Sequence, residues 1–162
     1  MLISPMTQNQ NQVQQIVNEL RQRGERVTIQ RRMVIEALCT TKGHQTVNDV
    51  RDTLKVHGEA MTESTVYRIL RWLNEHGFAS QTDLGAQGVV YELLYATPHH
   101  HLVCLACGSI TALDDGGIET LRKHVQDEYS FEPRVEHMAI FGWCKECQRK
   151  NLVGTFAHPQ SE

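Results

Sequence analysis

Apolar side chains recur every three or four residues through the first half of the chain, as in helices that bury one face. The first such stretch runs from Val13 to about Arg23, and Gly24 ends it. Thr28 and Thr46 precede the next two stretches and suit helix N-caps. The fourth and clearest stretch is residues 62–76. The residues predicted to face inward are Val13, Ile16, Val17, Leu20, Val34, Ala37, Leu38, Val47, Val50, Leu54, Val66, Ile69, Leu70 and Leu73.

The pattern changes from helices to strands after Gly77. Two β-prone runs, residues 78–83 and 89–93, flank a segment with Gly85 and Gly88, which predicts a hairpin. Helices followed by a hairpin is the order of elements in a winged helix-turn-helix domain. Residues 94–98 then read as a linker, with Pro98 as a stiff stop.

The second half alternates short strands with one helix. Strands are predicted over residues 99–104, 110–113 and 135–143, and Ile118, Leu121 and Val125 mark one face of a helix that ends near Tyr129. The predicted fold is therefore α+β, with a winged-helix domain followed by a small α/β domain. The predicted boundaries are a disordered N-terminus (1–12), a winged-helix domain (13–93), a hinge (94–98), a second domain (99–150) and a flexible tail (151–162).

Charge is distributed unevenly along the 162 residues, whose net charge is −3. Residues 1–76 contain ten Lys and Arg against eight Asp and Glu, a balance of +2, whereas residues 77–162 contain six against eleven, a balance of −5. A nucleic-acid surface is therefore expected only as a local patch in the first half. No apolar run is long enough for a transmembrane helix and no secretory signal is recognisable, so we expect a cytoplasmic protein with reduced thiols and no membrane contact.

The helix predicted over residues 62–76 has an apolar back and a polar front, as a DNA recognition helix needs. Its arginine and tyrosine side chains can reach phosphates and base edges, and arginines of the earlier helices can hold flanking phosphates. The candidate DNA contacts are Arg26, Arg31, Ser64, Thr65, Tyr67, Arg68 and Arg71. The same pattern also fits an ordinary surface helix, and the hairpin carries no Lys or Arg, so periodicity alone leaves both interpretations open.

Four of the five cysteines form two Cys-x-x-Cys pairs, Cys104 with Cys107 and Cys144 with Cys147. Four thiolates, each pair at a turn, are the usual closed tetrahedral set for structural Zn²⁺. Two redox-active dithiols are the alternative. Cys39 stands alone in an apolar helical pattern and is predicted to be a buried core residue.

Three consecutive histidines, His99, His100 and His101, directly precede the first cysteine pair. Side chains alternate between the faces of a strand, so His99 and His101 should point one way and His100 the other. The sequence thus predicts two distinct metal sites instead of one triple-histidine cluster. A histidine-rich tract that binds metal loosely is the alternative.

With these motifs placed, the chain resembles the ferric uptake regulator (Fur) family of metal-responsive transcriptional repressors over nearly all of residues 12–150. The segments that carry the resemblance are residues 26–31 (RVTIQR), 64–68 (STVYR), 91–93 (YEL), 99–108 (HHHLVCLACG) and 142–147 (GWCKEC). It implies a homodimer that binds double-stranded operator DNA through its winged-helix domains and associates through its α/β domains. It also implies a regulator and not an enzyme, and the chain has no His-Glu-x-x-His motif that would favour a zinc hydrolase.

The resemblance implies a regulatory metal site with ligands from both sides of the hinge: His44, Glu92, His99 and His101. The alternation of strand faces pairs His99 with His101 independently. A second metal site on the opposite face would take His100, Glu119 and His137. Metal at the regulatory site is expected to fix the orientation of the DNA-binding domains and so control metal homeostasis genes.

One position departs from the family pattern. A further acidic ligand usually stands five residues after the second cysteine of the first pair, and here that residue is Ala112. The remaining three imidazoles and one carboxylate suit tetrahedral Zn²⁺ better than the larger shells of Fe²⁺ or Mn²⁺, which predicts a zinc uptake regulator-like member. The alternatives are an iron- or peroxide-sensing member, or a constitutive DNA-binding protein whose only metal is the structural zinc.

Overall fold

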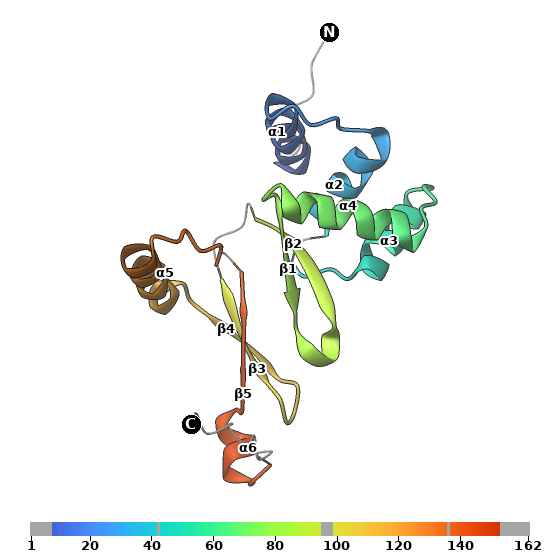
Figure 1. Cartoon of the computed structure of the whole chain (residues 1–162). Coiled ribbons are helices and arrows are strands. Elements are labelled where there is room, and N and C mark those ends of the chain that lie inside the picture. Colours follow the sequence, from blue (N-terminus) through green and yellow to red (C-terminus); the bar gives the residue numbers. More distant parts are fainter. Residues whose placement is uncertain (1–7, 42, 95–98, 136, 153–162) are drawn as a thin grey trace. The chain divides into compact units, whose positions relative to one another are not determined.

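A computed structural model describes residues 8–41, 43–94, 99–135 and 137–152 (Figure 1). The chain divides into two compact units, Met1–Thr82 with Gly88–Thr97, and Asp83–Gln87 with Pro98–Glu162. Helices and a hairpin make up most of the first unit, and a three-stranded sheet with two helices makes up most of the second. This mixture confirms the predicted α+β class.

The helices of the first unit begin where the sequence supplies capping groups. The Oγ1 atoms of Thr28, Thr46 and Thr62 each accept a hydrogen bond from the backbone N–H three residues on, which satisfies a donor that has no partner within the helix. Gly77 follows the fourth helix with φ +76°, a left-handed conformation that suits glycine. The helices are α1 (Gln8–Gln22), α2 (Ile29–Thr40), α3 (Val47–Val56) and α4 (Glu63–Glu75).

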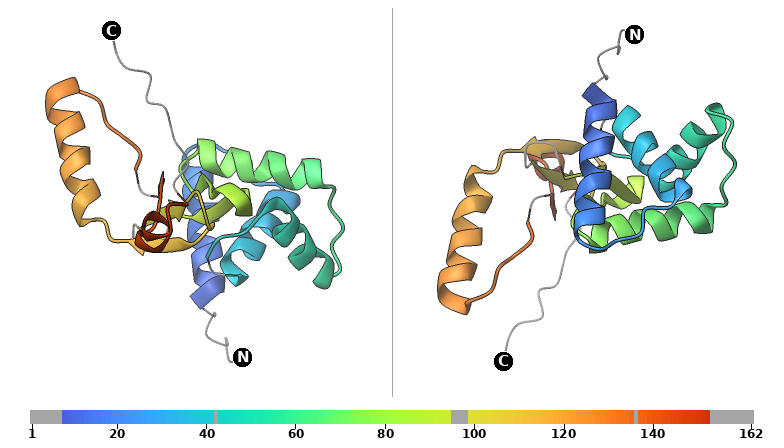
Figure 2. Two further views of the ribbon diagram at one scale, coloured as in Figure 1. Left: turned by 90° about the horizontal axis from the view of Figure 1, so that it is seen from below. Right: turned by 90° about the horizontal axis from the view of Figure 1, so that it is seen from above.

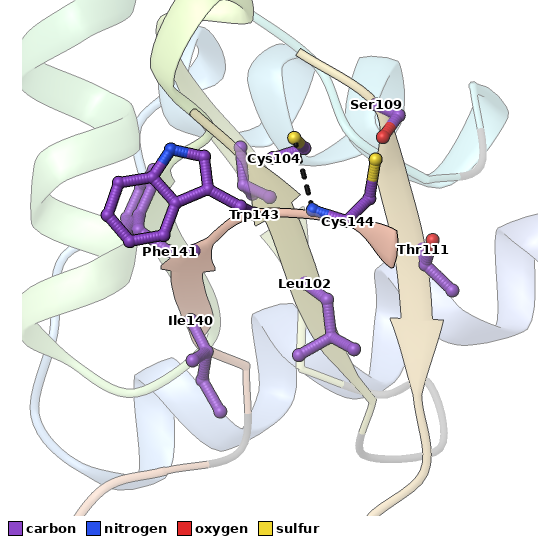
Figure 3. Close-up of a pocket in the computed structure, with 10 residues that line it drawn as sticks. Leu102, Cys104, Ser109, Thr111, Ile140, Phe141, Trp143 and Cys144 are labelled. Carbon is purple, nitrogen blue, oxygen red and sulfur yellow. Dashed lines mark hydrogen bonds between the residues drawn. The ribbon is translucent and has the colours of Figure 1, made fainter. Parts of the chain in front are cut away.

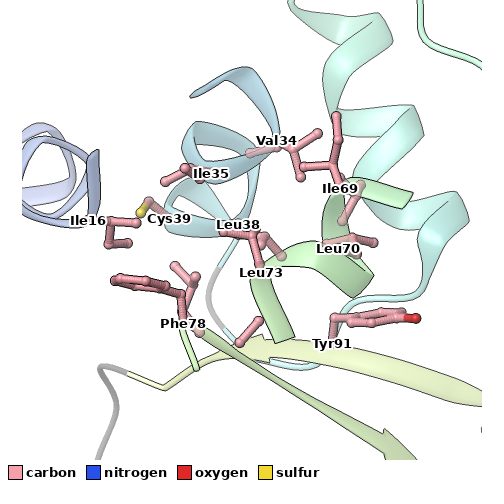
Figure 4. Packing of buried hydrophobic residues seen from close by; sticks show 14 of the residues in the cluster. Ile16, Val34, Ile35, Leu38, Cys39, Ile69, Leu70, Leu73, Phe78 and Tyr91 are labelled. Atoms are coloured by element: carbon pink, nitrogen blue, oxygen red, sulfur yellow. The ribbon is translucent and has the colours of Figure 1, made fainter. Parts of the chain in front are cut away.

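The core of the first unit forms where these helices meet the hairpin (Figure 4). Almost all of the apolar residues predicted to face inward are buried, and Val47 is only partly buried against them. Cys39 is also buried here, which confirms the prediction of a core cysteine. Burial raises the pKa of its thiol to about 11, and the charge of Glu36 adds to that shift, so the thiol stays protonated at neutral pH.

The hairpin joins β1 (Ala79–Asp83) to β2 (Val89–Leu93) through a short 3₁₀ turn, η1 (Gly85–Gln87). Gln45, between α2 and α3, pairs with Tyr91 of β2 as an isolated antiparallel bridge, with N···O distances of 3.0 and 2.8 Å. The buried Gln45 side chain also hydrogen-bonds Thr41 and the carbonyl of Leu38 at the end of α2. This bridge holds the α2–α3 connection against the second strand of the hairpin.

In the second unit β3 (His100–Cys104) is the central strand of a sheet in the order β4-β3-β5. It pairs antiparallel with β4 (Ile110–Leu113) and parallel with β5 (Ala139–Gly142). After α5 (Gly116–Tyr129) the chain runs back beside the helix towards β5 (Figure 2). A short helix, α6 (Lys145–Arg149), follows β5.

Three expectations need correction. Residues 8–12, predicted to be disordered, form the first turns of α1. The last strand is shorter than predicted: β5 begins at Ala139, opposite His101, and the Met138 carbonyl just before it accepts a hydrogen bond from the His101 N–H at 2.9 Å. Leu121, predicted to face inward, is 44% exposed, and Ile118 is the one residue of α5 that is buried.

Some predicted segments lie wholly or partly outside the described residues: 1–7 of the N-terminus, 95–98 of the hinge and 153–162 of the tail. Over the part of the chain that the structure describes, no helix has both the length and the apolar character needed to cross a membrane.

Candidate metal centres and DNA-facing helix

The four paired cysteines come together in the second unit, with their sulfur atoms within 4.8 Å of one another. Cys104 ends β3, and Cys107 follows in a turn that Gly108 completes with φ +71°. Cys144 is the N-cap residue of α6 and Cys147 lies in its first turn, so these two also point the same way. The Cys107 and Cys144 sulfurs are 3.9 Å apart. Tetrahedral zinc with bonds of about 2.3 Å sets its sulfur ligands about 3.8 Å apart, so the geometry fits.

Backbone amides prepare this cluster for a cation. The Cys144 N–H donates to the Cys104 sulfur at 3.3 Å (Figure 3), and this bond is the main cause that lowers the pKa of Cys104 to about 6. The pKa of Cys107 is also lowered, chiefly by the Ser109 hydroxyl. The adjacent thiols, Cys144 first, raise the pKa of Cys147 to about 12. A divalent cation is therefore needed before all four sulfurs become thiolates.

Three imidazoles converge elsewhere in the second unit. His99 and His101 lie on one face of the sheet with ring centroids 5.1 Å apart, as strand alternation predicts. The His137 ring packs against both, at 4.8 Å from His99 and 4.7 Å from His101. The Nε2 atoms of His101 and His137 are 2.8 Å apart. Nitrogen ligands of one tetrahedral zinc, with bonds of about 2.0–2.1 Å, lie about 3.3–3.4 Å apart, so a shift of about 0.5 Å lets these two rings share an ion.

His137 was predicted with His100 and Glu119, and the structure separates it from them. It precedes β5 instead of lying within it, and its ring turns to His101. His100 is fully buried on the opposite face, and its Nε2 lies 2.9 Å from Asp115 Oδ1. The His100 hydrogen bond is the main cause that lowers the pKa of Asp115. Glu119 pairs with Arg122. The predicted trio is therefore not brought together.

The first unit supplies its own pair of candidate ligands. The Gln45–Tyr91 bridge brings their neighbours His44 and Glu92 together, and His44 Nε2 lies 3.4 Å from Glu92 Oε2. Both side chains are partly buried. His44 and Glu92 are 48 positions apart, and only the register of the strand bridge brings them together. No local sequence pattern therefore signals this pairing.

Ala112 lies directly opposite His101 in the β3–β4 ladder. Residues paired in this way share a sheet face, with Cβ atoms about 4.5–5.5 Å apart. An acidic side chain at this position would thus reach the histidine cluster. Its absence leaves the cluster rich in nitrogen donors.

α4 presents the predicted polar front. Val66, Ile69 and Leu70 are buried, whereas Ser64, Tyr67, Arg68 and Arg71 are exposed. Tyr67 is 43% exposed, and Thr65 lies partly buried in the capping network of Thr62. Arg68 donates to the Ser64 carbonyl and Arg71 donates to Glu75. A DNA phosphate could replace either of these exposed contacts.

Arg26, before α2, and Arg31, within α2, differ in their contacts. Arg26 is exposed. The Arg31 guanidinium stacks 3.7 Å from the centroid of the Trp72 ring and donates to the Arg26 carbonyl at 2.6 Å. Arg31 therefore helps to hold α4 in place, a role that the sequence pattern did not reveal.

One face of the sheet in the second unit is apolar and open. Leu102 and Ile140, which pair in the β3–β5 ladder and so share this face, are about 40% exposed and line a pocket of about 190 Å³ beside the cysteine cluster (Figure 3). Phe141, which pairs with Val103, lies on the other face and is 43% exposed. Trp143 and Thr111 also line it. An apolar face of this kind in a small domain marks an interaction surface.

Comparisons with known proteins show what the chain is similar to. The sequence model of the ferric uptake regulator family matches residues 22–141. The ferric uptake regulation protein of Helicobacter pylori (strain ATCC 700392 / 26695) is 29% identical over 129 residues, which cover 80% of this chain and 86% of the relative. The structure of the Helicobacter pylori ferric uptake regulator Fur, described as having three functional metal binding sites, matches with a TM-score of 0.63 and 26% identity over 90% of this chain and 97% of that one. The ferric uptake regulator from Pseudomonas aeruginosa with manganese matches with a TM-score of 0.65 and 28% identity over 80% and 97% of the two chains.

Proposed function

Because the chain belongs to the ferric uptake regulator family of metal-dependent transcriptional regulators, which are not enzymes, we propose that it represses metal homeostasis genes when one exchangeable divalent ion fixes a DNA-competent dimer. The observation that carries the proposal is the convergence of His99, His101 and His137 in the second unit, apart from the four-cysteine cluster. A regulator needs a permanent metal for its fold and a separate, exchangeable one for its signal.

In this proposal the exchangeable ion is held by His99, His101 and His137 from the second unit and by His44 and Glu92 from the first. The ion joins two units that the chain connects through the predicted hinge, residues 94–98. A ligand shifts a conformational equilibrium only by binding one arrangement more tightly than the others. Ligands drawn from both units would give that difference, because only one arrangement of the units completes the set.

Zinc is the sensed metal that the donors favour. Ala112 supplies no carboxylate, and His137 adds an imidazole to the predicted set. Imidazole donors suit Zn²⁺, whereas carboxylate and water oxygens suit Mn²⁺. The name of the Helicobacter relative favours the second candidate, an iron-responsive member.

The proposed partners are operator DNA and a second copy of the chain. Tyr67, Arg68 and Arg71 are available on the exposed front of α4 for bases and phosphates, with Arg26 for a flanking phosphate. The apolar sheet face around Leu102 and Ile140 supports association through the second unit. Two recognition helices of such a dimer would read the half-sites of a palindrome. We place this regulator in the cytoplasm, where the operator and reduced thiols are found.

Operator binding with and without the exchangeable metal tests the function. Duplexes selected by the zinc-loaded dimer from a randomised library supply the operator, and a mild chelator then removes the exchangeable ion while the four-cysteine zinc stays. We expect the affinity to fall by about 5- to 150-fold, the usual range of coupling between two sites. His101→Ala should abolish the metal response, whereas His124→Ala, on the exposed surface of α5, should keep it.

Two outcomes would contradict the proposal. DNA affinity that is indifferent to the exchangeable ion would favour a constitutive DNA-binding protein. A response to Fe²⁺ or Mn²⁺ at concentrations where Zn²⁺ has none would replace zinc by the iron-responsive alternative. Arg68→Ala should weaken binding without changing the metal content, and Arg149→Ala, in α6, serves as its control.

A further inference from the structure

His100 is the one histidine of the triplet that faces away from the metal cluster. It is fully buried, its Nε2 is 2.9 Å from Asp115 Oδ1, and its Nδ1 has no hydrogen-bond partner among the described residues. Imidazole and carboxylate groups occur together at metal sites. The acidic side chains near His100 carry negative charge that a cation can neutralise.

The cation on this face is Arg122 of α5. Its Nη2 lies 3.6 Å from Asp115 Oδ1, and its Nη1 pairs with Glu119. Asp115 is the N-cap residue of α5 and Glu119 lies in its first turn, so Arg122, one turn further on, reaches back to both. The Arg122 side chain is only 26% exposed. One guanidinium thus links Asp115, the carboxylate that contacts His100, to Glu119.

We infer that the Arg122 guanidinium is a built-in cation that takes the place of a second exchangeable metal ion on the His100 face. A divalent ion could bind His100, Asp115 and Glu119 only by displacing a positive group that is covalently tethered beside them. Arginine stays protonated at all physiological pH values, so this neutralisation does not depend on metal supply. His137, which would complete a second site, lies with His101.

The inference rests on the proposed function only for the exchangeable ion of the His99–His101–His137 cluster. It extends that function by limiting this chain to one sensing ion. A chain with one sensing ion responds to metal in a single binding step, whereas two sensing sites would give a response in two stages.

Zinc counted per chain tests the inference on the full-length protein without DNA. The protein is dialysed to equilibrium against buffered Zn²⁺, and its metal is measured by mass spectrometry. Arg122→Met keeps the apolar stem and removes the charge, and it should bind one zinc ion more per chain than the wild type. Arg122→Lys, which keeps a cation, should match the wild type. Arg149→Met is the matched control, because Arg149 also pairs with an acid three residues away on its helix, Glu146, at 3.1 Å.

The extra ion must also depend on His100. In the double variant Arg122→Met with His100→Ala, the additional zinc should be lost while the four-cysteine zinc is retained. If Arg122→Met fails to fold, as judged by loss of the four-cysteine zinc, Arg122→Gln takes its place with the same expectation.

Two results would overturn the inference. The first is a folded, neutral Arg122 variant that binds no additional zinc. The second is a wild-type protein that itself loses one ion on His100→Ala. Neither result bears on the proposed function, which fails separately if operator binding ignores the exchangeable metal.

Discussion

The second unit should depend on its four-cysteine metal for folding, whereas the first unit should not. In the second unit, the buried aliphatic side chains among the described residues are Leu84, Val103 and Ile118. At about 2 kcal/mol each, they contribute roughly 6 kcal/mol. A structural zinc contributes about 10–16 kcal/mol of apparent binding free energy. The metal therefore outweighs the core of this unit, and the first unit has a core cluster of its own.

Cys147→Ser is the perturbation that isolates this dependence. Cys147 is buried and lies within 4.8 Å of the other three sulfurs. If the four thiolates share the binding free energy equally, the loss of one weakens zinc binding by about two to three orders of magnitude. At limiting zinc, the second unit should then unfold while the first remains folded.

Hydrogen exchange followed by mass spectrometry reads the two units separately in the intact chain. In Cys147→Ser, or after removal of all zinc, the amides of β3 and β5 should lose their protection, and those of α2 and α4 should keep it. Cys39→Ala is the control, because Cys39 lies in the first unit and outside the cluster. Protected β3 amides in zinc-free protein would refute the reasoning, since the apolar core of the second unit would then suffice.

Three further predictions concern metal choice, pH and the first unit. Ala112→Glu should shift the metal preference of the histidine cluster from Zn²⁺ towards Mn²⁺ or Fe²⁺, because Ala112 lies opposite His101; Thr120→Glu, on the exposed surface of α5, should leave the ratio of affinities unchanged, and equal shifts in both would disprove the assignment. Zinc affinity of the cysteine cluster, measured by chelator competition, should fall at least tenfold for each unit of pH between 8 and 7, because Cys147, with its pKa raised to about 12, must release a proton on binding; a flat profile would contradict this. Gln45→Met should destabilise the first unit by about 1–3 kcal/mol, because it removes the hydrogen bonds of the buried Gln45 amide to the Leu38 carbonyl and to Thr41; Gln14→Met, which removes a solvent-exposed hydrogen bond to Asn18, should cost far less in denaturant unfolding, and equal costs would show that the Gln45 contacts are not stabilising.

The first unit could be predicted closely because its signals are local. Threonine caps, apolar spacing and terminal glycines act within one or two turns, so the bounds of α2, α3 and α4 follow from neighbouring residues. Two Cys-x-x-Cys pairs likewise predict their own convergence, since each pair needs only a turn to align its sulfurs. The pairing of His99 with His101 follows from the two-residue period of a strand.

The wrong predictions concern residues whose surroundings depend on contacts between segments far apart in the chain. Leu121 has the spacing of a core residue, yet nothing in the described chain covers it. The partner of His137 depended on where β5 begins, because His137 lies before Ala139 and strand alternation does not set the direction of its side chain. Arg31 looked like a free phosphate anchor, and only the packing of α2 against α4 showed its contact with Trp72.

The triplet His99–His101 with the cysteine pairs shows the same division. The sequence alone determined which residue types could hold metal and that His100 faces away from its neighbours, and the family resemblance added that an acidic ligand is missing at Ala112. The tertiary structure decided that His137 joins His101, that the Gln45–Tyr91 bridge sets His44 beside Glu92, and that Arg122 neutralises the acids near His100. The physical reason is that periodicity is a property of neighbouring residues, whereas a metal site is made by strand register and helix packing between residues far apart in the chain.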